Sequence, residues 1–285
     1  MKVGTILRTN TNHYRIVELL GRGAQGSVYK ALRQDDLVVA IKLLRVASAD
    51  ALRRFQNEAW TYHRFKNNFV NLLDWSLNTD RPFLVLEFCI HSSARSQINF
   101  LKFWHSVTVP LLAQTAAALA ELHQYDMLYR DFKPENLLIT QDGFGPWKAK
   151  LGDAGLICLP PELNLIQTTQ LVRGTPEYMA PELFIPGALY TKQAEAFAFG
   201  VTAYELLSGI RPKAGAQVLT GPSEVRPLLT ALIAEDPTVR PSLNDAHQQL
   251  VVVSQRLKER NRSIAVTAIA AIGLIMLSVG RRRND

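Results

Sequence analysis

Cysteine is scarce in this chain, which has only Cys89 and Cys158 among its 285 residues. Neither belongs to a CxxC pair or to a cluster with histidine, so the sequence gives no sign of a zinc site or a disulfide framework. We therefore expect two reduced thiols. The opening residues, MKVGTILRTNTNHYRI, also lack the apolar run of a secretory signal peptide. We expect the folded domain to stay in the cytoplasm.

An excess of positive charge is missing from most of the chain. The formal net charge is +7, but residues 256–285 carry +5 of it and the first 255 residues only +2. A nucleic-acid groove needs basic side chains gathered on a folded surface, so we expect no nucleic-acid partner. A hydrophobic content of 47% and a charged content of 20% are ordinary for a globular protein and argue against disorder.

The predicted elements separate into a β-rich front and a helical back. The first ninety residues alternate like strands, interrupted by one predicted helix at residues 48–65. Residues 109–127 and 193–209 have the composition of helices, and the second is apolar on nearly every side, as in a buried helix that ends near Gly209. The sequence therefore predicts an α+β protein of two lobes with a cleft between them.

Residues 264–280, IAVTAIAAIGLIMLSVG, contain no charged residue and are flanked by basic residues on both sides. A helix of this length spans about 26 Å, near the lower limit for crossing a bilayer. We expect a transmembrane helix here, between a basic juxtamembrane linker at 256–263 and a short basic tail at 281–285. This would be a single-pass C-terminal anchor with residues 1–255 in the cytoplasm. A buried core helix is the alternative.

Three glycines, Gly21, Gly23 and Gly26, have the spacing GxGxxG. Dinucleotide-binding folds share this spacing, but there a helix follows directly and its N-terminus binds the pyrophosphate. Here the next residues, SVYKAL, are strand-like. We therefore expect a hairpin with a glycine tip whose backbone N–H groups approach phosphates from above.

Lys42 follows three apolar residues in VAIK, so we expect its ammonium group to point into the cleft. A buried ammonium needs an anionic partner, and Glu58 on the predicted helix supplies a carboxylate. The pair would place Lys42 where it can contact the phosphates of a nucleotide. An ordinary surface ion pair is the alternative.

Together with motifs further along, these residues resemble the eukaryotic-type (Hanks-type) serine/threonine protein kinase family. The resemblance runs from about Tyr14 to Leu250, and the motifs occur in the family's order: GRGAQGSV, VAIK, YRDFKPEN, GDAG, GTPEYMAPE and DPTVRPS. It implies a two-lobed protein-kinase fold, with an N-terminal lobe at about 1–87 and a C-terminal lobe at about 88–255. It also implies ATP and Mg²⁺ as cofactors and proteins with Ser or Thr as substrates.

The resemblance gives each motif residue a role. Asp131 would act as the catalytic base toward the attacking hydroxyl, with Lys133 near the transferred phosphoryl group. Asn136 and Asp153 would hold Mg²⁺. The other catalytic residues would be Lys42 and Glu58. The expected ATP-binding residues are Gly21, Gly23, Gly26, Val28, Ala40, Lys42, Glu87, Cys89 and Leu138.

Further expectations concern the activation segment. Glu182 would pair with Arg240 and tie this segment to the helical lobe, and Thr175 would touch the catalytic loop through its hydroxyl. In the family, an Arg at the position of Arg130 often binds an activating phosphate. We therefore expect phosphorylation at Thr168 or Thr169.

The chain departs from the family at several positions. Tyr129 replaces the usual His, and Ala154 replaces the Phe of DFG; we expect Tyr129 and Tyr62 to fill part of the space left by that Phe. Glu195 replaces the Asp that braces the catalytic loop. None of these changes removes a group that touches phosphate or metal. We therefore interpret them as altering regulation more than abolishing catalysis. The segment 210–236 is also short, which leaves the mode of substrate docking open.

Two functions compete at this point. One is an active Ser/Thr kinase anchored by its C-terminal helix, and the other is a membrane-anchored nucleotide-binding pseudokinase scaffold. A decayed site usually loses at least one group that contacts phosphate or metal, whereas this chain retains all five: Lys42, Glu58, Asp131, Asn136 and Asp153. The retained set favours the enzyme.

Overall fold

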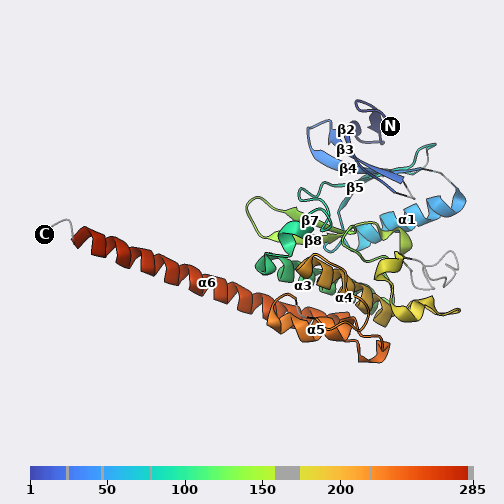
Figure 1. The fold of residues 1–285 in the computed structure, drawn as a ribbon. Coiled ribbons are helices and arrows are strands. Elements are labelled where there is room, and N and C mark those ends of the chain that lie inside the picture. Colours follow the sequence, from blue (N-terminus) through green and yellow to red (C-terminus); the bar gives the residue numbers. More distant parts are fainter. Residues whose placement is uncertain (24–25, 46–47, 78, 158–173, 219, 282–285) are drawn as a thin grey trace.

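The computed structural model describes residues 1–23, 26–45, 48–77, 79–157, 174–218 and 220–281, with side chains described as far as Ser263. These residues fold into a β-rich lobe that contains the N-terminus and a helical lobe that leads to the C-terminus (Figure 1). The predicted two-lobed α+β architecture is confirmed.

The N-terminal lobe is built on an antiparallel sheet of six strands in the order β1-β2-β3-β4-β6-β5. Helix α1 (Ala49–Arg64) belongs to the same lobe and packs against strands of this sheet. The side chain of Ser48 caps the helix by accepting a hydrogen bond from the N–H of Ala51. The strands are β1 (Ile6–Arg8), β2 (His13–Arg22), β3 (Gly26–Arg33), β4 (Val38–Leu44), β5 (Leu72–Ser76) and β6 (Phe83–Glu87).

The two faces of this sheet have different surroundings because side chains alternate along a strand. Val39 and Ile41 of β4 belong to a separate core on the outer face of the lobe. Ala40 and Lys42 therefore point the other way, and Ala40 packs against the core that continues into the helical lobe. Val28 of β3 is the direct cross-strand partner of Lys42. Three of the predicted site residues thus share one face of the sheet.

The helical lobe is arranged around α4 (Lys192–Ser208), which is buried from Ala194 to Leu207. Gly209 ends this helix with a φ of 83°, a left-handed conformation that glycine adopts without strain. The predicted buried helix ending near Gly209 is confirmed. The other elements are α2 (Ile98–Leu101), α3 (His105–Gln124), β7 (Leu137–Gln141), β8 (Trp147–Leu151), α5 (Arg226–Leu232) and α6 (Leu243–Arg281), with short 3₁₀ turns η1 (Ala154–Leu156), η2 (Pro176–Tyr178), η3 (Pro181–Phe184), η4 (Ser223–Val225) and η5 (Pro237–Val239).

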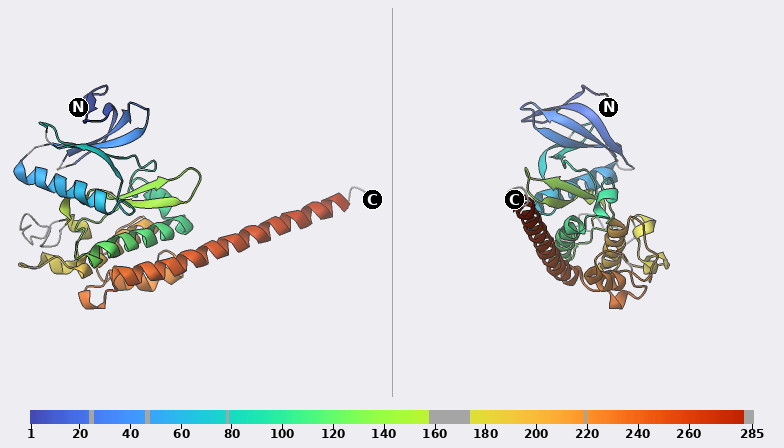
Figure 2. Two further views of the ribbon diagram at one scale, coloured as in Figure 1. Left: turned by 180° about the vertical axis from the view of Figure 1, so that it is seen from behind. Right: turned by 60° about the vertical axis from the view of Figure 1, so that its left-hand side comes forward.

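Helix α6 begins on the helical lobe and extends away from both lobes (Figure 2). Its first turns pack on α3, where the Nδ1 atom of His247 hydrogen-bonds to the carbonyl of Ala113 at 2.9 Å. Leu257 is still buried in the core, so the segment 256–263, predicted as a linker, continues the same helix without a break.

No helix is long and apolar enough to cross a membrane among the residues whose side chains the structure describes. The predicted transmembrane segment, 264–280, lies in the helical part of α6 beyond those side chains, and most of the predicted tail, 282–285, lies outside the described residues. The structure therefore gives the membrane anchor no support, and the anchor stays a prediction from the sequence.

Candidate active site

Lys42 lies between two carboxylates from different parts of the chain. Its Nζ atom is 2.6 Å from Oε1 of Glu58 on α1 and 2.8 Å from Oδ1 of Asp153, which follows β8. Burial alone would lower the pKa of Lys42, but the attraction of Glu58 and Asp153 outweighs it and raises the pKa above its usual value. Lys42 therefore stays charged, and it connects both lobes at the predicted phosphate site.

The two carboxylates differ in their surroundings. Glu58 is completely buried, and this burial raises the pKa of its carboxyl group against the opposing effect of Lys42. Asp153 retains 42% of its side-chain exposure, and the charge of Lys42 outweighs partial burial and lowers the pKa of its carboxyl group. Asp153 is thus an accessible carboxylate that stays ionised, whereas Glu58 is closed to solvent and holds Lys42.

A second cluster surrounds Asp131, which follows Arg130 in the predicted catalytic loop. The hydroxyl of Thr175 donates to Oδ1 of Asp131 at 2.7 Å, and the Nζ atom of Lys133 donates to Oδ2 at 2.7 Å. Lys133 also donates to the Thr175 hydroxyl at 2.5 Å. The predicted contact between Thr175 and the catalytic loop is therefore present, and the side chains of all three residues converge.

Asn136 completes this cluster. Its Nδ2 atom donates to the backbone carbonyl of Asp131 at 2.8 Å and approaches Oδ2 of Asp131 at 3.3 Å. Because these bonds use the amide nitrogen, the oxygen Oδ1 of Asn136 is left as an acceptor. An amide oxygen and an ionised carboxylate are the hard ligands that Mg²⁺ takes from proteins.

The donor set therefore fits the predicted metal. Among the described residues, no three His, Cys, Asp or Glu side chains gather into a metal-binding cluster. Mg²⁺ does not need one, because it usually takes one or two protein ligands and completes its shell with water and substrate phosphates. Asn136 and Asp153 would be those protein ligands.

The predicted hairpin with a glycine tip, here called the phosphate flap, is formed by β2, β3 and the turn between them. The N–H of Gly23 donates to the carbonyl of Gly26 at 2.9 Å, and residues 24–25 lie outside the described part of the chain. A Cβ atom at Gly26 would lie 2.1 Å from the backbone oxygen of Leu43, so only glycine fits there. A Cβ at Gly21 or Gly23 would meet no atom within 4 Å, which leaves space beside the flap.

The predicted adenine contacts are apolar and incompletely covered. Val28, Ala40 and Leu138 are each partly exposed, unlike the core residues beside them. Apolar side chains that keep some exposure can bury the faces of a flat base. These three residues come from β3, β4 and β7, so both lobes contribute to this surface.

The side chains of two other predicted ATP-binding residues, Glu87 and Cys89, are not free to contact ATP. The carboxylate of Glu87 accepts hydrogen bonds from the backbone N–H and side-chain amide of Asn71 and lies 3.5 Å from Lys150, so any contact of Glu87 with ATP would come from its backbone. Cys89 is buried, and burial raises the pKa of its thiol to about 12. The expected reduced thiol is therefore inert at neutral pH, and Cys158 lies outside the described residues.

The catalytic loop is braced from α4, as the sequence predicted. Oε1 of Glu195 accepts a hydrogen bond from the backbone N–H of Arg130 at 2.8 Å, and Oε2 lies 2.7 Å from Nε2 of His123 on α3. Arg130 has a φ of 72°, which residues other than glycine seldom adopt. The longer side chain of Glu195 thus still reaches this strained backbone, and His123 is a partner that sequence analysis did not identify.

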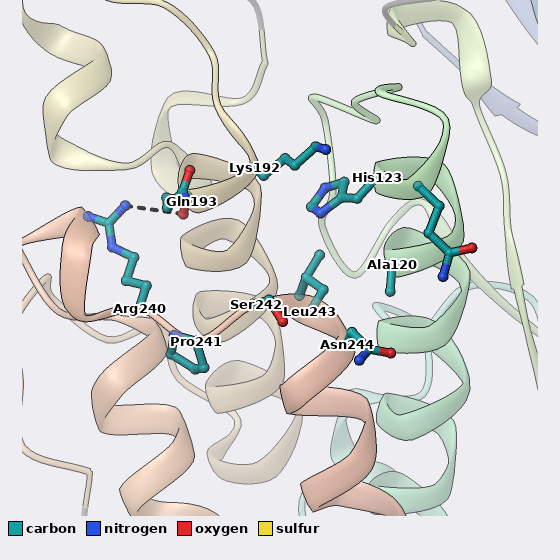
Figure 3. Close-up of a pocket in the computed structure, with 10 residues that line it drawn as sticks. Ala120, His123, Lys192, Gln193, Arg240, Pro241, Ser242, Leu243 and Asn244 are labelled. Carbon is teal, nitrogen blue, oxygen red and sulfur yellow. Dashed lines mark hydrogen bonds between the residues drawn. The ribbon is translucent and has the colours of Figure 1, made fainter.

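The activation segment is joined to the helical lobe by a bidentate ion pair. Arg240 donates to both carboxylate oxygens of Glu182 at 2.6 and 2.9 Å, which confirms the predicted pairing. The Arg240 guanidinium also donates to the carbonyl of Gln193 (Figure 3). Thr168 and Thr169, the predicted phosphorylation sites, lie outside the described residues. Their pairing with Arg130 stays a prediction.

A pocket of about 240 Å³ lies beside this ion pair, between α3, α4 and the start of α6 (Figure 3). None of the residues predicted for catalysis, ATP or Mg²⁺ lines it. His123 lines the pocket and also contacts Glu195, which braces the backbone of Arg130 next to Asp131. The pocket is therefore separate from the candidate active site.

The sequence is similar to those of known proteins. Residues 14–252 match the family described as protein kinase domain. The chain is 33% identical over 211 residues, or 71% of its length, to wall-associated receptor kinase 5 of Arabidopsis thaliana. It is 31% identical over 217 residues, or 72% of its length, to wall-associated receptor kinase-like 1 of the same plant. The chain belongs to the protein kinase family, and the matched region covers only 28% of each of these two relatives.

Proposed function

We propose that this protein kinase transfers the γ-phosphate of ATP to Ser or Thr hydroxyls of protein substrates. The observation that carries the proposal is the cluster of Asp131, Lys133 and Thr175. A carboxylate offers about four acceptor positions, so Asp131 retains one for a substrate hydroxyl beside the bonds from Lys133, Thr175 and Asn136. Asp131 would take the proton of that hydroxyl as phosphate transfer proceeds.

Positive charge would come from both sides of the transferred group. Lys133 lies beside Asp131, and Lys42 is held on the opposite lobe by Glu58. Mg²⁺, when bound, neutralises charge on the phosphates. Asn136 and Asp153 are the residues that we propose to hold it. Such fixed charges stabilise the transition state because they need no reorganisation as the reaction proceeds.

ATP would lie between the lobes. The turn at Gly21, Gly23 and Gly26 would cover its phosphates, and its base would lie against Val28, Ala40 and Leu138. Glu87 and Cys89 would contribute through the backbone of the segment that joins the lobes. Polar backbone groups within an apolar surface are the usual way to orient a flat ligand.

The proposal extends to the cellular setting. The two relatives are named as wall-associated receptor kinases, and we propose a similar signalling role for this chain. A single-pass anchor at residues 264–280, with the kinase domain in the cytoplasm, rests on the sequence pattern alone.

The acceptor specificity can be measured directly. The protein is incubated with ATP carrying a labelled γ-phosphate, Mg²⁺ and a general protein substrate, and the labelled amino acids are then identified. We expect phosphoserine and phosphothreonine, because Lys133 in the RDFKPEN loop resembles Ser/Thr kinases. Label found only on tyrosine would contradict the proposed specificity while leaving kinase activity intact.

A further inference from the structure

Two buried tyrosines hold the backbone on either side of Asp153. The hydroxyl of Tyr129 donates a hydrogen bond to the carbonyl of Gly152, and the N–H of Ala154 donates to the hydroxyl of Tyr62 at 3.4 Å. Each tyrosine is only 1% exposed. The residue before Asp153 and the residue after it are therefore each fixed by a side chain from elsewhere in the fold.

The Tyr62 hydroxyl also contacts the ion pair of Lys42. It donates its proton to Oε1 of Glu58 at 2.6 Å, the same oxygen that accepts from Lys42 at 2.6 Å. A hydroxyl has one proton and two lone pairs, so this bond leaves a lone pair for the N–H of Ala154. Hydrogen bonds thus run without a gap from Lys42 on β4, through α1, to the backbone next to Asp153.

The tyrosine rings are themselves held in a row of aromatic side chains. The ring of Phe69 lies 6.0 Å from that of Tyr62 and 6.1 Å from that of Tyr129, and the row continues through Phe132 to Phe199 on α4. Ala154, which stands at the position of Phe in the family pattern DFG, is buried but contributes no ring. Ring packing therefore sets the direction of both hydroxyls. The segment that carries Asp153 contributes no ring to this row, so the row does not hold that segment in place.

The backbone at Asp153 has a conformation that its surroundings must stabilise. Asp153 has a φ of 42°, in the left-handed region that residues other than glycine seldom occupy, and such a conformation persists only where its surroundings enforce it. Burial raises the pKa of both tyrosine hydroxyls well above the usual value, so both keep their protons at neutral pH. Both hydroxyls can therefore donate a hydrogen bond at neutral pH.

We propose that Tyr62 and Tyr129 are positioning residues that fix Asp153 and Glu58 for the binding of Mg²⁺ and ATP, a task that falls to their hydroxyls because residue 154 has no aromatic ring. This proposal rests on the proposed function, since it concerns the same site. It predicts that loss of either hydroxyl alters how strongly Mg²⁺ assists ATP binding, beyond any effect on stability.

The test compares Tyr62→Phe and Tyr129→Phe with a matched control, Tyr14→Phe. Each change removes one oxygen and keeps the ring. Tyr14 is also 1% exposed and donates to a carboxylate, Oδ2 of Asp74 at 2.7 Å, but it belongs to the outer core of the N-terminal lobe. The affinity of the full chain for a non-hydrolysable ATP analogue is measured by calorimetry with and without Mg²⁺.

In wild type and in Tyr14→Phe, we expect Mg²⁺ to increase the affinity for the analogue by the same factor. In Tyr62→Phe and Tyr129→Phe, this factor should fall about tenfold, because Asp153 is no longer held toward the metal. Thermal unfolding of all variants supplies the structural control, since Tyr129→Phe and Tyr14→Phe each lose one hydrogen bond and Tyr62→Phe loses two.

The proposal is overturned if Mg²⁺ assists binding equally in all four proteins, if Tyr14→Phe loses as much of this assistance as the other variants, or if the wild type gains nothing from Mg²⁺. Its fate is separable from that of the proposed function. A wild type that binds the analogue in this tyrosine-dependent way but transfers no phosphate would refute the activity and support the positioning role.

Discussion

Asp153→Asn is expected to reduce phosphate transfer at least about a hundredfold while the protein stays folded. The substitution preserves the shape of the side chain but removes the charge that Mg²⁺ requires. Asp153 is partly exposed and ionised, and its neighbours on both sides are held through their backbones, so the neutral amide should occupy the same position. The measurement is the initial rate of labelled phosphate transfer at saturating ATP over a range of Mg²⁺ concentrations.

A suitable control is Asp142→Asn. Asp142, in the turn between β7 and β8, is a well-exposed carboxylate that pairs with Lys148 and has no role assigned in catalysis or in Mg²⁺ binding. This variant should retain the wild-type rate and the wild-type dependence on Mg²⁺. An Asp153→Asn protein that works at the wild-type rate would remove Asp153 from the metal site.

Lys42→Ala is expected to lose both activity and stability. The rate should fall by at least about a hundredfold, because a fixed cation at the phosphates is lost. Stability should fall as well, because the completely buried Glu58 would lose its cation, and breaking a buried ion pair costs about 3 kcal/mol or more. Transfer assays and denaturant unfolding measure the two losses separately.

A double variant separates the two roles of Lys42. Lys42→Met combined with Glu58→Gln removes the buried charge together with its partner, so most of the lost stability should return. Activity should not return, because no cation reaches the phosphates. Recovery of activity in the double variant would show that the loss in Lys42→Ala came from instability alone, and it would contradict the role given to Lys42.

The sequence predicted contacts wherever the chemistry requires a particular partner. A lysine placed among apolar strand residues needs a carboxylate, and Lys42 does pair with Glu58. The bracing of the catalytic loop by Glu195 and the pairing of Glu182 with Arg240 were likewise predicted from motif positions, and both are present.

Contacts that depend on side-chain direction could not be predicted in this way. The sequence does not show that the hydroxyls of Tyr62 and Tyr129 reach the backbone around Asp153. Nor does it show that Phe69, from the segment after α1, lies between their rings. The sequence did reveal that Tyr129 and Ala154 depart from the family pattern. The hydrogen bonds of the tyrosine hydroxyls could not be predicted from it, because they depend on how the folded chain orients these side chains.

Short elements also escaped prediction. Strand β1 has three residues, and β7 and β8 have five each, too few for alternation to stand out from chance. These strands are nevertheless important for the site, because β7 follows Asn136 directly and β8 leads into Gly152 and Asp153. The hairpin that they form brings its two ends together, so that the N–H of Gly152, next to Asp153, donates to the carbonyl of Asn136 at 2.9 Å.

The central claim, that this chain is a working kinase and not a nucleotide-binding scaffold, is tested most directly by phosphate transfer from labelled ATP in wild type and in Asp131→Asn. Both proteins should bind an ATP analogue with Mg²⁺ equally well, because Asp131 is assigned to the attacking hydroxyl and not to the nucleotide. The wild type should transfer label to protein, and Asp131→Asn should transfer at least about a hundredfold less. Equal transfer by the two proteins, or none by a wild type that binds the analogue, would contradict the claim.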